Sequence, residues 1–170
     1  MNTMIKISSV RWQQVIQHLL PDTDSREQAA FLFATSTKFS HHVDFDVIDT
    51  ELLTSDDFDA QLDDYLELGD STRARLIKKA HDLSASLIEL HSHPGPWKAA
   101  FSWSDRIGLQ QTVPHMWWRL HKRPYLALVV APSGFDALVW LDNPKTPVAL
   151  NGLMAGDALL KPTNFSLEGW

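Results

Sequence analysis

The chain has 170 residues, of which 44% are hydrophobic and 21% charged. This composition is typical of a soluble globular protein, and we take residues 1–170 as a single domain. The absence of cysteine excludes disulfides, thiolate nucleophiles, iron–sulfur clusters and cysteine-ligated zinc. A net charge of −6 argues against nucleic acid as a partner, and no run reaches the roughly 20 apolar residues of a membrane span. We therefore expect a cytoplasmic protein with neither nucleic acid nor a membrane as partner.

The first part of the chain predicts one helix and two strands. Ser8 or Ser9 can cap a helix whose apolar residues recur at helical spacing until Pro21 ends it. The continuous apolar run 29–35 is typical of a strand that is buried on both faces. Apolar and polar residues then alternate over 43–47, which predicts a half-buried strand.

An acidic stretch follows, with eleven Asp or Glu residues and no Lys or Arg over 44–70. Such a charge run predicts a solvated loop, with a short helix near 61–68. Ser71 then opens a second helix with one charged face. The run 86–93 is typical of a strand, which Pro94 and the following Gly-Pro end.

The last part of the chain predicts a helix, a hairpin and a packed tail. Ser102 can cap a third helix, which Pro114 is expected to kink or interrupt. Segments 125–131 and 135–141 flank a Pro-Ser-Gly turn and predict a β-hairpin. The apolar tail over 147–170 can add another strand or two. Together these elements predict a mixed α/β (α+β) fold, with a central mixed β-sheet flanked by helices.

His91 and His93 are the strongest candidates for metal ligands. Side chains two residues apart in a strand point to the same face, so both imidazoles can reach one ion. Asp105 falls in the first turn of the helix that Ser102 caps, where the helix dipole favours a carboxylate. Two His and one Asp leave a fourth tetrahedral position for water, as in catalytic zinc sites. Asp105 can equally form a capping box with Ser102, and the two roles are compatible.

These residues resemble the JAMM motif of the JAB/MPN metalloproteases, in which a Glu precedes His-x-His and Ser-x-x-Asp. The resemblance extends over most of the chain, and the matching positions are Glu27, His91, His93, Ser102 and Asp105. Eight residues separate His93 from Ser102, one more than in the family pattern. Ser104 is therefore an alternative to Ser102.

The resemblance implies an MPN/JAB domain that holds one zinc ion per chain through His91, His93 and Asp105. It also implies that Glu27 is the general base and later the general acid, and that Ser102 donates a hydrogen bond to the oxyanion. The activity it implies is that of an isopeptidase or peptidase. Such an enzyme cleaves the bond after the C-terminus of a ubiquitin-like protein, as a deubiquitinase does.

Within that family, segment 114–137 is most similar to small stand-alone JAB proteins of bacteria. Those proteins often accompany a ubiquitin-like protein with its activating and conjugating enzymes, in operons that include antiphage systems. The partners implied are therefore a ubiquitin-like protein, its conjugates, and the activating and conjugating enzymes. The acidic stretch 44–70 would then either dock a basic tail of the substrate or be only a solvated loop.

Two other functions stay open on the same residues. One is a non-catalytic MPN scaffold that binds partners, although such domains typically lose ligand positions that this chain retains. The other is a zinc hydrolase that trims a residue from the C-terminus of a sulfur-carrier protein. That hydrolase differs from the isopeptidase only in its substrate.

Overall fold

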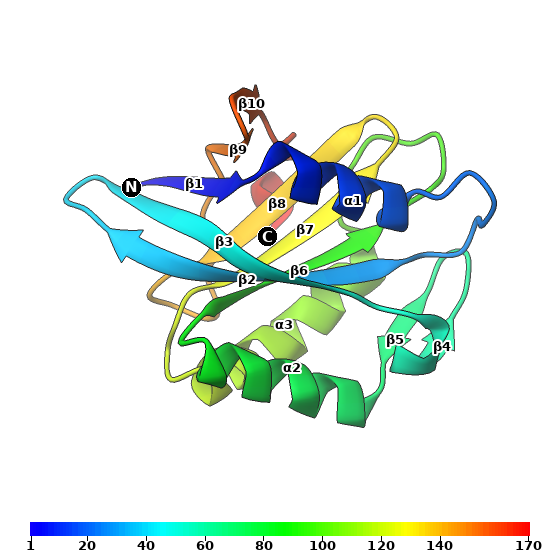
Figure 1. Cartoon of the computed structure of the whole chain (residues 1–170), viewed down its shortest axis with the longest axis horizontal. Coiled ribbons are helices and arrows are strands. Elements are labelled where there is room, and N and C mark those ends of the chain that lie inside the picture. The colour runs from blue at the N-terminus through cyan, green and yellow to red at the C-terminus, as the bar shows by residue number, and fades with distance from the viewer.

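The computed structural model describes all residues 1–170 and shows a curled eight-stranded sheet with three α-helices (Figure 1). The α-helices are α1 (Ser9–Leu19), α2 (Asp70–Asp82) and α3 (Trp103–Arg119), and two short 3₁₀ helices are η1 (Ser55–Asp57) and η2 (Leu167–Gly169). The strands are β1 (Asn2–Ile7), β2 (Ala29–Lys38), β3 (His42–Leu52), β4 (Phe58–Gln61), β5 (Leu66–Leu68), β6 (Ser86–Ser92), β7 (Tyr125–Ala131), β8 (Gly134–Trp140), β9 (Gly152–Ala155) and β10 (Ala158–Leu160). The sheet order is β10-β9-β1-β3-β2-β6-β7-β8, and β4 and β5 form a separate hairpin. The predicted mixed α/β fold with a central mixed sheet is confirmed.

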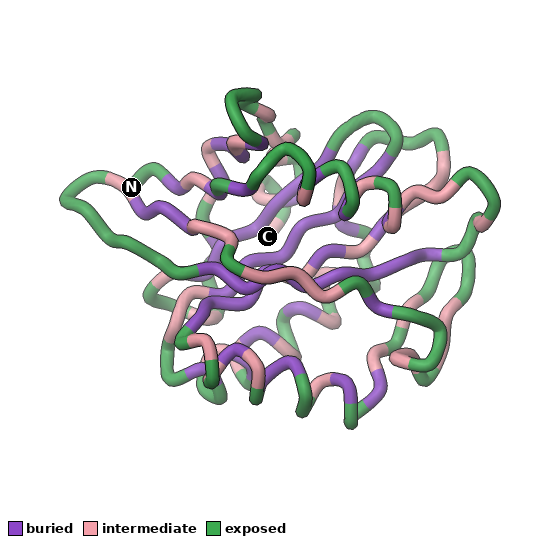
Figure 2. The backbone as a smooth tube through the Cα atoms, in the orientation of Figure 1, coloured by how far each residue is buried: buried purple, intermediate pink, exposed green.

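The sheet separates two apolar cores. Helix α1 covers one face, and α2 and α3 cover the other (Figure 1). Buried residues are concentrated along the central strands, which contact a helical layer on each side (Figure 2). This double burial explains why β2, β6 and β7 are almost continuously apolar in sequence. None of the helices combines the length and apolar character that a membrane crossing requires.

Strand β6 is central to the functional site. It pairs antiparallel with β2 and parallel with β7, so His91 lies between Ala29 and Val129. Successive side chains of a strand alternate between faces. Leu87 packs in the core shared with α2 and α3, whereas Leu90 packs in the core shared with α1. Glu89 and His91 therefore face the same side as Leu87, toward α3.

Three strands, β1, β4 and β5, were not predicted from the sequence. Residues 61–68 form part of the β4–β5 hairpin, so the short helix predicted there is wrong. The hairpin is favoured over a helix because it lets Phe58, Leu66 and Leu68 pack together against the core under α2 and α3. Strand β1 has a period of two, with Thr3, Ile5 and Ile7 buried, but it is too short for that pattern to stand out.

Helix α3 continues through Pro114 as one helix, so the predicted interruption is wrong. A proline inside a helix removes one backbone hydrogen bond and crowds the preceding turn. Val113 and Met116 on either side of it are buried in the core that α2 and α3 share with the sheet. Packing of this apolar face holds the helix together despite the local cost.

Replacing Pro114 with Ala should therefore stabilise the protein. Alanine restores a backbone N–H for the carbonyl four residues earlier and removes the ring, which predicts a gain of ~1–3 kcal/mol in the free energy of unfolding. Urea unfolding followed by circular dichroism measures this change. Pro96→Ala, in an exposed loop, is the control and should give no gain. A Pro114→Ala protein less stable than wild type would show that the ring itself packs favourably.

Candidate metal centre

His91 and His93 lie at the end of β6, where the strand leads into the loop before α3. The backbone N–H of His93 donates to the carbonyl of Val130 at 2.8 Å, so the chain stays extended beyond the last residue of the strand. Both imidazoles consequently point to one side. Their Nε2 atoms lie 3.2 Å apart.

Asp105 reaches the same point from the first turn of α3. The Ser102 Oγ accepts a hydrogen bond from the backbone N–H of Asp105 at 3.1 Å, and the Asp105 Oδ2 accepts one from the Ser102 N–H at 2.7 Å. This capping box fixes the carboxylate. The Oδ2 atom also lies 3.5 Å from the Nε2 of His91 and 3.3 Å from that of His93. The predicted capping box is confirmed, and the same geometry leaves the Asp105 carboxylate placed where it could hold a metal ion with the two imidazoles.

The three side chains have the spacing of a single metal site. Their ligand atoms all lie within 4.8 Å of one another. A tetrahedral zinc ion with bonds of about 2.0–2.1 Å separates its ligand atoms by about 3.3–3.4 Å. The distances of 3.2, 3.3 and 3.5 Å among these atoms match that separation. Two imidazole nitrogens and one carboxylate oxygen also suit zinc chemically, and three protein ligands leave a fourth position free.

Glu27 lies beside the three ligands because the β2–β6 pairing continues past the strand ends. The Ser92 N–H donates to the carbonyl of Gln28 at 3.0 Å, and the Gln28 N–H donates to the Ser92 Oγ at 2.9 Å. This extension puts Glu27 opposite His93, with its Oε1 3.4 Å from the His93 Nε2. Glu27 is only 5% exposed and is not one of the three clustered ligands. A general base would occupy such a position.

The β4–β5 hairpin holds the backbone of Glu27. The Glu27 N–H donates to the carbonyl of Leu62 at 2.9 Å, and the Gln61 Nε2 donates to the carbonyl of Glu27 at 2.8 Å. These contacts join segments more than thirty residues apart in sequence. Part of the acidic stretch thus supports the site structurally.

Burial and neighbouring charges shift the pKa values of the site residues in different directions. Burial raises the pKa of Glu27, although the two His rings partly oppose this change. Burial also disfavours ionisation of Asp105, but hydrogen bonds with His91 and His93 outweigh it and hold that pKa below its usual value. For His91, burial disfavours the charged ring, yet the contact with Asp105 raises its pKa overall. Of the two carboxyl groups, Glu27 is the one suited to carry a proton.

Two serine hydroxyls lie close to the metal ligands. The Oγ of Ser102 lies 2.9 Å from the Oγ of Ser104, and either can donate to the other. Ser102 also accepts the capping hydrogen bond of Asp105. Ser104 lines the cleft next to the centre, whereas Ser102 lies outside that lining. Both serines predicted as oxyanion donors therefore lie near the ligands, and Ser102 has a structural role in addition.

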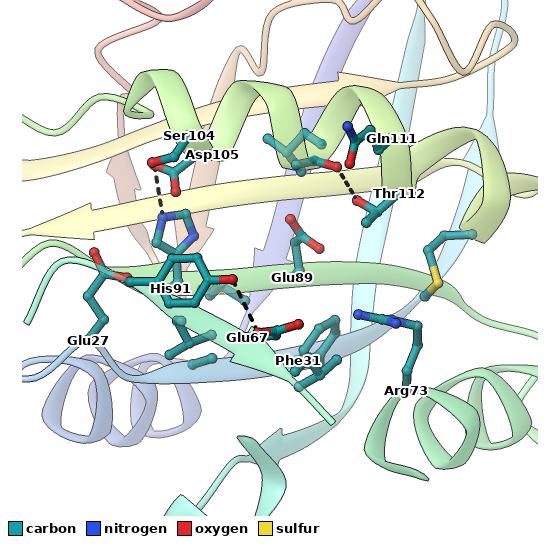
Figure 3. Close-up of a pocket in the computed structure, with 18 of the residues that line it drawn as sticks. Glu27, Phe31, Glu67, Arg73, Glu89, His91, Ser104, Asp105, Gln111 and Thr112 are labelled. Atoms are coloured by element: carbon teal, nitrogen blue, oxygen red, sulfur yellow. Dashed lines mark hydrogen bonds and ion pairs between the residues drawn. The ribbon is translucent and has the colours of Figure 1, made fainter. Parts of the chain in front are cut away.

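A cleft of about 360 Å³ extends from the metal ligands between α3 and β5 (Figure 3). Glu27, His91 and Asp105 lie at one end of it, and Arg73 lies at the other (Figure 3). Sequence reasoning missed Glu89, which projects into the cleft between these ends. The signal was present, because Glu89 is two residues before His91 and shares its face of the strand.

Five of the eleven acidic residues in the stretch 44–70 form ion pairs within the fold, and most of the stretch belongs to β3, η1, β4 and β5, so the solvated loop predicted for it is wrong over much of its length. Its ion pairs join Lys6 to Asp44, Lys79 to Asp49 and Glu51, Arg75 to Glu51 and Asp57, and Arg73 to Asp70. The Arg73–Asp70 pair lies within α2, and the other pairs connect β1 and α2 to β3 and η1. Of the acidic residues in the stretch, only Asp64 and Glu67 line the cleft.

Comparison with known proteins gave no match to any protein-family model and none to any curated protein. The functional interpretation therefore rests on the site itself and on the motif that its residues form.

The capping box predicts a selective effect of substitutions at Ser102. Ser102→Ala removes the acceptor for the Asp105 N–H and should lower the free energy of unfolding by ~1 kcal/mol. Ser102→Thr keeps a capping hydroxyl and should retain most of the wild-type stability. Chemical unfolding of the three proteins tests this. Equal losses for Ala and Thr would mean that the hydroxyl does not act as a cap.

Proposed function

We propose that this chain is a zinc-dependent isopeptidase or peptidase of the JAB/MPN type, which cleaves the bond after the C-terminus of a ubiquitin-like protein. The observation that carries the proposal is the convergence of His91, His93 and Asp105 at 3.2–3.5 Å, with Glu27 beside them. These four residues are four of the five that match the JAMM motif in sequence, and Ser102 is the fifth. A scaffold without activity has no need of a buried carboxyl at the position of Glu27, which favours an enzyme.

The residues of the site have distinct roles in this reaction. Zinc held by the two imidazoles and Asp105 would lower the pKa of a bound water and polarise the scissile carbonyl. Glu27 accepts a proton from the attacking water at its carboxylate and returns one to the leaving amine nitrogen. The burial that raises its pKa suits this carboxyl to hold the proton between the two steps. The hydroxyl of Ser102 or Ser104 donates to the carbonyl oxygen as negative charge develops there.

The partners follow from the proposed reaction. The substrate would be a ubiquitin-like protein joined through its C-terminus to a second protein. Activating and conjugating enzymes would make that bond in the same cytoplasm, and this chain would reverse it.

Zinc binding provides the first test. The purified protein should bind about one zinc ion per chain, and His91→Ala or Asp105→Ala should lose most of it, because two remaining ligands hold zinc weakly. Metal analysis after dialysis measures the content. His115→Ala, which removes an exposed imidazole on α3, is the matched control and should keep its zinc. Unchanged zinc in all three variants would place the ion elsewhere.

Substitution of Glu27 separates catalysis from metal binding. Glu27→Gln should keep zinc but slow cleavage of a ubiquitin-like fusion protein by a factor of ~10²–10⁴, since the general base is lost. Gel analysis of the fusion protein, with and without a chelator, measures the rate. Glu168→Gln, an exposed site with the same charge change, should cleave at the wild-type rate. An active Glu27→Gln enzyme would show that another group takes the proton.

A further inference from the structure

Glu89 is a carboxyl in the cleft that the proposed reaction does not use. It lies on β6 two residues before His91. In a strand, this spacing puts the Cα atoms of the two residues about 6–7 Å apart. It is not among the clustered metal ligands. Its side chain projects from β6 toward α3, beside Thr112 and Gln111 (Figure 3).

The carboxylate of Glu89 is held in place but keeps one oxygen free. The hydroxyl of Tyr125, a fully buried residue of β7, donates a hydrogen bond to Oε2. No protein group donates to Oε1, and this atom is not enclosed by the protein. The basic side chain that lines the cleft belongs to Arg73, but its guanidinium pairs with Asp70 at 3.2 Å rather than with Glu89.

Apolar side chains form part of the walls around Glu89. They come from β2, β5 and α3, and are those of Ala29, Phe31, Leu66, Leu68, Leu109 and Met116. A partly apolar cleft that holds a fixed carboxylate matches the side chain of arginine or lysine. These side chains carry an aliphatic stem that packs on apolar surface and a cationic head that donates hydrogen bonds.

We propose that Glu89, positioned by Tyr125, forms a recognition subsite for an arginine or lysine side chain of the substrate. The head would donate to the free Oε1, and the stem would contact Phe31 and Met116. Asp64 and Glu67 on the hairpin also line the cleft and favour a cationic occupant.

That the occupant belongs to a substrate rests on the proposed function, whereas the binding of a basic side chain does not. The test therefore measures binding without cleavage. N-acetyl-arginine amide, its lysine counterpart and the neutral isostere N-acetyl-citrulline amide are titrated into ¹⁵N-labelled protein and followed by NMR. The basic ligands should shift the amide signals of Phe31, Glu89 and Thr112, and citrulline should bind about tenfold more weakly than arginine.

Variants then assign the effect to one carboxylate. Glu89→Gln keeps an acceptor for Tyr125 and should lose the discrimination between arginine and citrulline. Glu168→Gln, with the same charge change outside the cleft, should keep it. Equal binding of arginine and citrulline to the wild-type protein, no binding of either basic ligand, or unchanged discrimination in Glu89→Gln would each overturn the proposal.

The two proposals fail in different ways. A protein that binds arginine through Glu89 but cleaves no ubiquitin-like fusion would refute the isopeptidase and leave the subsite. An active isopeptidase that binds citrulline as well as arginine would refute the subsite alone.

Discussion

The pairing of β2 with β6 is the constraint on which the site depends. Its register places Ala29 opposite His91, and the bonds between Gln28 and Ser92 carry the pairing to Glu27 and His93. Along the paired residues 29–34 and 86–91, both strands are largely buried on both faces. A slip of one residue would therefore point the His91 side chain into the apolar core beneath α1. The same packing that stabilises the sheet therefore fixes the face on which the imidazoles and Glu27 meet. No separate interaction is needed to align them.

The sequence predicts the local parts of this arrangement better than the distant ones. Strand alternation is enough to put His91 and His93 on one face, and the three-residue spacing from Ser102 is enough to place Asp105 in the first helical turn. Both depend on residues a few positions apart. The support of Glu27 by Leu62 and Gln61 depends on a hairpin whose pairing is visible only once the chain is folded. The ion pairs of the acidic stretch were missed for the same reason.

The end of the chain contributes to the site through the loop between β6 and α3. The Phe101 N–H donates to the Ser166 Oγ at 2.8 Å, and the Ser166 N–H donates to the carboxylate of Asp136 at 2.9 Å. Asp136 is fully buried on β8, so this chain of bonds connects the sheet to the residue just before the helix cap. Arg106, the residue after Asp105 in α3, donates from its guanidinium to the carbonyl of Gly169 at 2.7 Å. These contacts hold the start of α3, and with it Asp105, against the two imidazoles.

The balance of charge around the cleft favours a cation there. Glu27, Glu89 and Asp105 bring three carboxyl groups to one side of the sheet, in surroundings where burial raises the cost of each negative charge. Arg73 lies at the far end of the cleft and pairs with Asp70 instead. A divalent ion on the His-His-Asp ligands would offset part of this charge near Asp105 and Glu27. It would leave Glu89, beyond its reach as a ligand, to attract a second positive group, which the basic side chain of a substrate can supply.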